Sequence, residues 1–169
     1  MKFRKDLYYR NMLLVTMGTQ PIQCERIINT IIDSNIKEKI IIQSYYKNEQ
    51  KKLIPKNIQI KQFISYYDMQ KYYNEADIIV VSGTGGIFRA LKQHKKVIIF
   101  PRLGKYKEAI NDHGLDMKVL KDEGYAEFVE DERDFKKIYL KCKNSKYKKY
   151  ISNNNNFVHI LQEEIEKIK

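Results

Sequence analysis

Short apolar runs recur along the chain, and most are followed by a turn and then by residues with helical spacing. Such runs, or weak alternation in the case of 58–64, predict strands with buried side chains. We expect strands over residues 12–16, 40–42, 58–64, 77–81, 97–100 and 125–129. Between them we expect helices from Pro21, over 68–76, from a glycine-rich turn to Leu91, and over 111–123.

Alternation of strands and helices implies crossover connections and therefore a mostly parallel sheet. We expect an α/β fold, a Rossmann-like parallel sheet with helices on both faces, within residues 1–140. Ligands of such sheets bind at the carboxyl ends of the strands. Residues 141–169 differ, because a basic linker is followed by a C-terminal amphipathic helix. Its apolar stripe consists of Phe157, Ile160, Leu161, Ile165 and Ile168.

Composition narrows the class of protein. The 169 residues suit one domain, and no apolar run approaches the roughly 18 residues that cross a bilayer. The N-terminus lacks the features of a signal peptide, so we expect a cytoplasmic protein. Two cysteines and three scattered histidines predict neither a disulfide framework nor a metal site.

The net charge of +11 favours an anionic partner. An AT-rich genome, which would enrich Lys, Ile, Asn and Tyr together, is an alternative source of the lysines. We expect no nucleic-acid partner, because the chain contains no recognised nucleic-acid motif.

Two glycine-containing turns follow predicted strands. The first holds Gly18, Thr19 and Gln20, and the second runs from Ser82 through Gly83, Thr84 and Gly85 to Gly86. Glycines let the backbone approach a ligand closely, and a helix N-terminus attracts a phosphate. The alternatives are a glycine-rich turn shaped by packing and, at the first turn, a helix capped by Thr19.

A third candidate follows the predicted strand 97–100, where Arg102 and two lysines could neutralise a diphosphate. The alternative is a solvated basic loop. Beyond it, Asn111, Asp112 and His113 open a predicted helix. They would either cap that helix or place Asp112 or His113 against a sugar or diphosphate.

These segments, in this order, resemble the glycosyltransferase family 28 C-terminal domain over roughly residues 12–130. The resemblance is carried by residues 15–20, 63–65, 68–69, 75–77, 83–85, 90–91, Pro101, Arg102, Lys105, Tyr106, Glu108 and 111–113. The chain is similar to free-standing donor-binding subunits of two-component enzymes. Such subunits occur in bacterial exopolysaccharide synthesis and in the dolichol-pathway N-acetylglucosaminyltransferase.

The resemblance implies one half of a GT-B fold and an inverting, metal-independent transfer from a UDP-sugar, with no cofactor. It implies that Phe63 and Ile64 hold the uracil and that Glu108 belongs to the donor site. It also implies a membrane-anchored partner subunit that binds the acceptor and holds this chain at the inner face of the membrane, near anionic lipid. No residue of this chain is a convincing catalytic base, so we expect that base on the partner.

The chain departs from the family pattern at five positions: Val81, Gly86, Arg89, Ala109 and Gly114. The family usually has histidine, serine, an acidic residue, histidine and glutamine there. These departures leave two further readings open, an altered donor or a non-catalytic regulatory subunit of the same fold. A basic nucleic-acid-binding protein remains an alternative that only the charge supports.

Overall fold

The centre of the protein is a parallel sheet. The structure, a computed structural model, describes residues 11–18, 20–112 and 114–167, and within them the sheet has six strands in the order β3-β2-β1-β4-β5-β6. Every neighbouring pair is parallel. The strands are β1 Met12–Thr16, β2 Lys39–Gln43, β3 Ile58–Lys61, β4 Ile78–Val81, β5 Lys96–Ile99 and β6 Glu127–Phe128. The predicted fold class is therefore confirmed.

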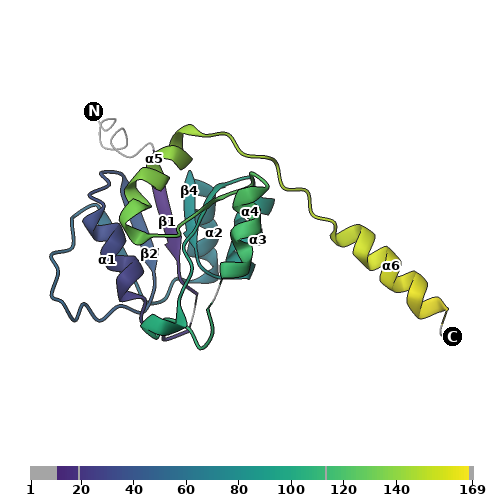
Figure 1. The fold of residues 1–169 in the computed structure, drawn as a ribbon, viewed down its shortest axis with the longest axis horizontal. Helices are drawn as coiled ribbons and strands as arrows, with labels where there is room; N and C mark the ends of the chain where they lie inside the picture. Colours follow the sequence, from purple (N-terminus) through teal and green to yellow (C-terminus); the bar gives the residue numbers. More distant parts are fainter. Residues whose placement is uncertain (1–10, 19, 113, 168–169) are drawn as a thin grey trace.

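Helices cover both faces of this sheet (Figure 1). The α-helices are α1 Glu25–Asp33, α2 Tyr66–Glu75, α3 Thr84–Lys92, α4 Val119–Asp122, α5 Phe135–Asn144 and α6 Asn154–Glu166. Helices α1 and α5 pack in one hydrophobic cluster, and α2, α3 and α4 pack in the other. The two clusters exist because successive strand residues point to opposite faces of the sheet.

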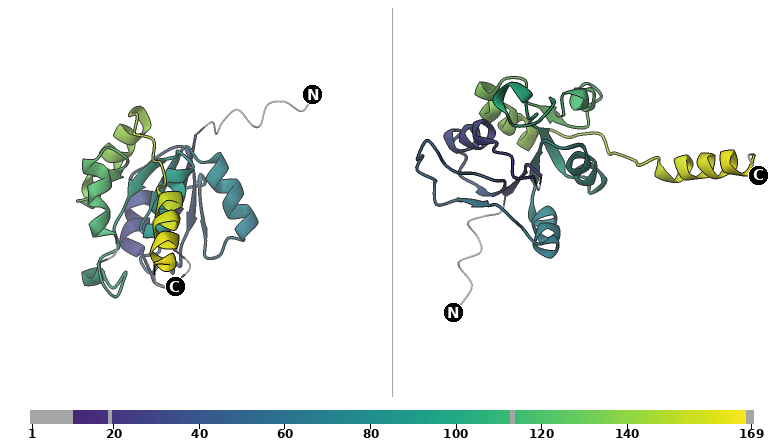
Figure 2. Two further views of the ribbon diagram at one scale, coloured as in Figure 1. Left: turned by 90° about the vertical axis from the view of Figure 1, so that its right-hand side faces the viewer. Right: turned by 90° about the horizontal axis from the view of Figure 1, so that it is seen from below.

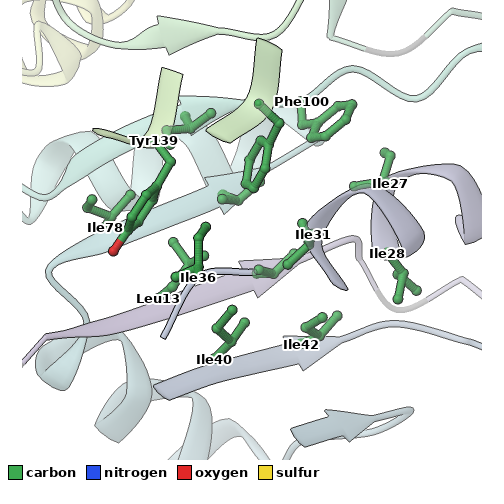
Figure 3. Packing of buried hydrophobic residues seen from close by; sticks show 14 of the residues in the cluster. Leu13, Ile27, Ile28, Ile31, Ile36, Ile40, Ile42, Ile78, Phe100 and Tyr139 are labelled. Atoms are coloured by element: carbon green, nitrogen blue, oxygen red, sulfur yellow. The ribbon is translucent and has the colours of Figure 1, made fainter. Parts of the chain in front are cut away.

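The strand residues divide between these clusters in alternation. Leu13 and Val15 of β1 join the α1–α5 side, whereas Leu14 joins the α2–α3 side. On the α1–α5 side, Ile27 and Ile31 of α1 pack over β1 and β2 (Figure 3). Both faces of β1 are thus covered, as its unbroken apolar run predicts.

The helix boundaries differ from the predictions, for α2 only by one or two residues (Tyr66–Glu75 against 68–76). Helix α1 begins at Glu25 rather than at Pro21, since the preceding segment is extended and Gln23 forms an isolated parallel bridge with Tyr45. Helix α3 begins at Thr84, which places Gly85 and Gly86 in its first turn rather than in a loop. The helix expected over 111–123 is a 3₁₀ turn over Leu115–Lys118 followed by the short α4.

The C-terminal part has two sections. Helix α5 crosses the predicted boundary after residue 140 and buries Phe135, Tyr139 and Cys142 against the sheet. A connection over 145–153 then leads to α6, in which every residue is exposed. Figures 1 and 2 show α6 standing away from the sheet and its helices. None of the helices in the described part of the chain has the length and apolar character needed to span a bilayer.

Candidate functional site

The strand order reverses between β1 and β4. From β1 the chain proceeds outwards through β2 to β3, and it then returns to β4 on the other side of β1. Ligands of open α/β sheets bind at such a switch point, outside the carboxyl ends of the strands. The glycine turns after β1 and β4 both lie there, because the two strands are parallel neighbours.

Two cavities meet at these turns, and Gly18 and Gly83 line both of them. The first, here called the aromatic cavity, has a volume of about 410 Å³. It is lined by Thr16, Gln43, Phe63, Ile64, Tyr66, Met69, Tyr73, Gly86 and Arg89 as well. The second, here called the loop cavity, has a volume of about 510 Å³. It is also lined by Met17, Gln20, Thr84, Gly85, Arg102, Ala109, Ile110 and Asn111.

The N-terminus of α3 lies where the cavities meet. Gly83 is its N-cap and provides no side-chain cap, so the backbone N–H groups of Thr84, Gly85 and Gly86 are those of an open first turn. Such N–H groups, with the positive end of the helix dipole, form an anion site. A Cβ at Gly85 would meet no described atom within 4 Å. Packing within the described chain therefore does not require glycine there, and the space beside it is open to a ligand.

A side chain of β2 holds the turn that follows β1. Gly18 has a φ of +91°, a left-handed conformation that favours glycine. The buried side chain of Gln43 donates a hydrogen bond of 2.7 Å from Nε2 to the Gly18 carbonyl oxygen. Nothing in the sequence points to Gln43, because a glutamine at the end of a strand carries no signal of this contact. Thr19, proposed as a ligand residue or a cap, lies outside the described residues.

Arg102 is placed in the loop cavity. Its residue is 8% exposed, and its Nε is shielded from solvent without a hydrogen-bond partner in the described chain. The neighbouring thiol of Cys24 has its pKa raised to about 11 by burial, which the positive charge of Arg102 opposes. Arg102 makes no salt bridge with a carboxylate of the described residues, and it lies at the edge where a diphosphate is expected.

Glu108 is placed differently from Arg102. It is 1% exposed and lines neither cavity. Its carboxylate accepts hydrogen bonds from Arg26 Nε at 3.2 Å and Nη2 at 2.7 Å, and from the Leu103 N–H at 3.1 Å. Arg26 also donates to the Pro101 carbonyl oxygen at 2.9 Å and lies over the ring of Tyr106. This network holds the loop after β5 in place, so Glu108 acts on the site through the backbone.

The remaining predicted residues lie at the cavities, at the surface or in the core. Phe63 is exposed and Ile64 is buried, and both line the aromatic cavity. Asn111 lines the loop cavity, whereas exposed Asp112 accepts a 2.8 Å hydrogen bond from the Gly104 N–H. Ser82 is fully buried, and its hydroxyl donates to the Phe100 carbonyl oxygen at 2.5 Å. His113 lies outside the described residues.

At Gly114, one of the five departures from the family pattern, the backbone conformation and a close backbone contact require glycine. Its φ is +91°, and a Cβ there would lie 2.8 Å from the Ser82 carbonyl oxygen. A longer side chain at this position would collide with the turn after β4. The loop carrying Asn111 therefore approaches that turn as closely as it does because residue 114 is glycine.

Arg89, another departure, lies inside the site. It belongs to α3, lines the aromatic cavity and places its guanidinium carbon 4.1 Å from the centre of the Tyr73 ring. In the sequence Arg89 is only a departure from the family pattern, because its distance from Tyr73 depends on how α2 and α3 pack. Within residues 11–18, 20–112 and 114–167, no three His, Cys, Asp or Glu side chains cluster as metal ligands would.

Comparisons with known proteins agree with this geometry. Residues 12–163 match the model of the glycosyltransferase family 28 C-terminal domain. Among solved structures, the glycosyltransferase of kitacinnamycin superposes with a TM-score of 0.63 at 14% identity, covering 85% of this chain and 37% of its own. The fold matches one half of such GT-B glycosyltransferases.

Two UDP-GlcNAc 2-epimerases share the fold as well. The Methanocaldococcus jannaschii enzyme, solved with UDP-GlcNAc and UDP, has a TM-score of 0.60 at 16% identity over 92% of this chain and 46% of its own. The Neisseria meningitidis enzyme, bound to UDP-GlcNAc, has a TM-score of 0.57 at 14% identity, with coverages of 92% and 44%. The chain spans less than half the length of these three structures. No curated protein sequence matches it significantly.

The buried pair of Arg26 and Glu108 yields a stability prediction. Glu108→Gln keeps the shape but removes the charge that compensates a guanidinium with only 12% of its side chain exposed. Breaking a buried pair in this way costs about 3–5 kcal/mol. We expect a loss near the lower limit, since Arg26 keeps Glu132 as a second carboxylate at 3.3 Å. Urea unfolding measures it. The control Glu132→Gln removes a carboxylate whose side chain is 37% exposed, and it should cost under about 1 kcal/mol. Equal losses of stability in the two variants would contradict the larger contribution of the buried pair of Arg26 and Glu108.

Proposed function

The chain belongs to the glycosyltransferase family 28 C-terminal domain family, and from this premise we propose that it is the donor-binding subunit of a UDP-sugar-dependent glycosyltransferase. In this proposal the enzyme is active only with a partner subunit. The acceptor is a lipid-linked or exopolysaccharide glycan, and UDP-sugar is the donor substrate, with no further cofactor.

The observation that carries the proposal is the meeting of two cavities at an anion site. A nucleotide-sugar has a nucleoside and a sugar on either side of a diphosphate. The open N-terminus of α3 suits the diphosphate, since it presents backbone N–H groups where the cavities join. The aromatic cavity, with Phe63 at its edge, suits the nucleoside. The loop cavity, with Arg102 and Asn111, suits the diphosphate edge and the sugar.

The same groups would favour sugar transfer. When the bond between the sugar and the diphosphate breaks, negative charge develops on the leaving UDP. Fixed donors aimed at that charge stabilise the transition state more than the ground state. Here they would be the N–H groups of α3 and the guanidinium of Arg102. The acceptor hydroxyl attacks from the opposite side of the sugar, which inverts the anomeric centre, and its proton passes to a base on the partner.

The exposed helix α6 supports the proposal of a partner subunit. Its side chains are all exposed, and Phe157, Ile160, Leu161 and Ile165 put an apolar stripe on one helix face. Ile168, the last member of the predicted stripe, lies outside the described residues. A helix with one apolar face suits a hydrophobic groove on another protein. We propose that this groove belongs to the membrane-anchored, acceptor-binding subunit. The net positive charge of the chain would then favour a position near anionic lipid, where each well-placed cation contributes about 1 kcal/mol.

A non-catalytic regulatory subunit of the same fold is the second candidate. Its support is that the family's usual polar residues are replaced at Val81, Gly86 and Ala109. Sugar transfer by the complex with the partner separates the two candidates, because a regulatory chain would leave turnover intact when its own donor site is altered.

Nucleotide binding is the first test. We expect UDP to bind at least tenfold more tightly than ADP, because the family resemblance assigns the loop of Phe63 and Ile64 to uracil and both residues line the aromatic cavity. Titration calorimetry with both nucleotides measures the difference, which is about 1.4 kcal/mol for a factor of ten. Equal affinities, or no heat with either nucleotide, would count against the proposed donor.

Arg102→Ala tests the contact with the diphosphate. A hydrogen bond to a charged group contributes about 1.5–3 kcal/mol, so UDP affinity should fall more than about tenfold. Lys105→Ala, which removes an exposed cation from the same loop, is the matched control and should change affinity little. Melting temperatures of the ligand-free variants exclude unfolding as the cause. If UDP affinity is unchanged in Arg102→Ala, Arg102 does not bind the diphosphate.

The partner is tested on α6. We expect the chain to co-purify with the product of the adjacent reading frame, and sugar transfer to need both. Ile160→Asp with Leu161→Asp should abolish co-purification without lowering the domain's melting temperature, since both side chains are about half exposed. Gln162→Asp, a polar change between the stripe residues, is the control. Robust sugar transfer by the purified single chain would refute the two-subunit proposal.

A further inference from the structure

The aromatic cavity has one charged side chain among its described lining residues, and that side chain is Arg89. Arg89 is the sixth residue of α3, three positions after Gly86. Residues three apart lie on the same face of a helix, and both line this cavity. The cation is therefore set back along the helix from the first-turn N–H groups that suit the diphosphate.

Tyr73 holds the guanidinium in position. The Tyr73 ring is 2% exposed and lies 4.1 Å from the guanidinium carbon, close enough for a cation–π contact. Burial raises the pKa of the Tyr73 hydroxyl, so the ring beneath Arg89 stays neutral. This contact limits the positions that the guanidinium can take at the cavity.

The guanidinium of Arg89 is only partly buried. Its Nη2 is shielded from solvent and lacks a hydrogen bond within the part of the chain that the structure describes, so Nη2 faces the protein. Arg89 as a whole is partly exposed and lines the aromatic cavity, so a ligand there could reach the rest of the guanidinium. Arginine has N–H donors and no acceptor, so the ligand atom that meets it must be an acceptor.

We propose that Arg89 is a specificity-determining residue that donates to an oxygen of the nucleoside, either uracil O4 or a ribose 2′- or 3′-hydroxyl. The assignment rests on the proposed function, which puts the nucleoside in the aromatic cavity. The diphosphate is served by the α3 N-terminus and by Arg102, which lines the other cavity. An amine at the position of the oxygen would set donor against donor, which lowers the affinity for that ligand.

Nucleotide analogues distinguish uracil O4 from the ribose hydroxyls as the acceptor atom. CDP replaces O4 by an amine, and 2′-deoxy-UDP and 3′-deoxy-UDP each lack one hydroxyl, while all three keep the diphosphate. Binding of these and of UDP is measured by calorimetry for the unaltered chain, for Arg89→Met and for Lys92→Met. Methionine keeps apolar contact with Tyr73 but has no donor. Lys92→Met is the matched control, since it removes an exposed cation three residues further along the same helix.

We expect Arg89→Met to weaken UDP binding by about tenfold, and Lys92→Met to change it less than about twofold. The analogue that lacks the acceptor should lose little more in Arg89→Met, because its contact is already missing. That analogue identifies the atom: CDP points to O4, and a deoxy analogue points to the hydroxyl it lacks.

Two results would overturn the assignment while the proposed function stands. One is a UDP affinity that Arg89→Met leaves unchanged. The other is an equal loss for UDP and all three analogues, which would place the effect on the diphosphate or on the fold. Failure of the unaltered chain to bind UDP would instead overturn the proposed function, and the assignment with it.

Discussion

Parallel pairing of β1 with both β2 and β4 is the constraint on which the rest of this structure depends. Parallel neighbours cannot be joined by a tight turn, so each connection must return across a face of the sheet. All carboxyl ends consequently lie at one edge, and the reversal of strand order at β1 opens a crevice there. The turn at Gly18 and the start of α3 at Thr84 are neighbours only for this reason.

Charge is distributed unevenly around that crevice. Arg26 is neutralised by Glu108 and Glu132, and it ties α1 to the loop after β5. Arg102 and Arg89, by contrast, each have a shielded nitrogen without a partner in the described residues. Buried unpaired donors lower stability, so these two arginines are candidates for a functional role. The pair of Arg26 and Glu108 serves the fold, and we propose that Arg89 and Arg102 meet acceptor atoms of the donor nucleotide.

Two of the departures from the family pattern have physical consequences in this chain. Gly114 is required by its positive φ and by its approach to the Ser82 carbonyl oxygen. Arg89 gives the aromatic cavity a cation and a specific place for it over Tyr73. The structure offers no account of Val81 beyond its full burial in β4.

The sequence by itself determined the strands, the parallel α/β class and the glycine turn at Gly18, because apolar runs and glycines act locally. It placed the second glycine segment after the right strand but extended the turn to Gly86, where α3 has already begun. It also indicated Phe63, Ile64, Arg102 and Asn111 as residues near the site. It missed α5, although Phe135, Tyr139 and Cys142 recur at the spacing i, i+4, i+7 of a buried helix face. Only the tertiary structure decided that Glu108 pairs with Arg26, 82 residues away, that the Ser82 hydroxyl faces the core, and that α6 stands away from the domain. The physical reason is that such contacts depend on which elements the sheet order brings together, and no local periodicity records that order.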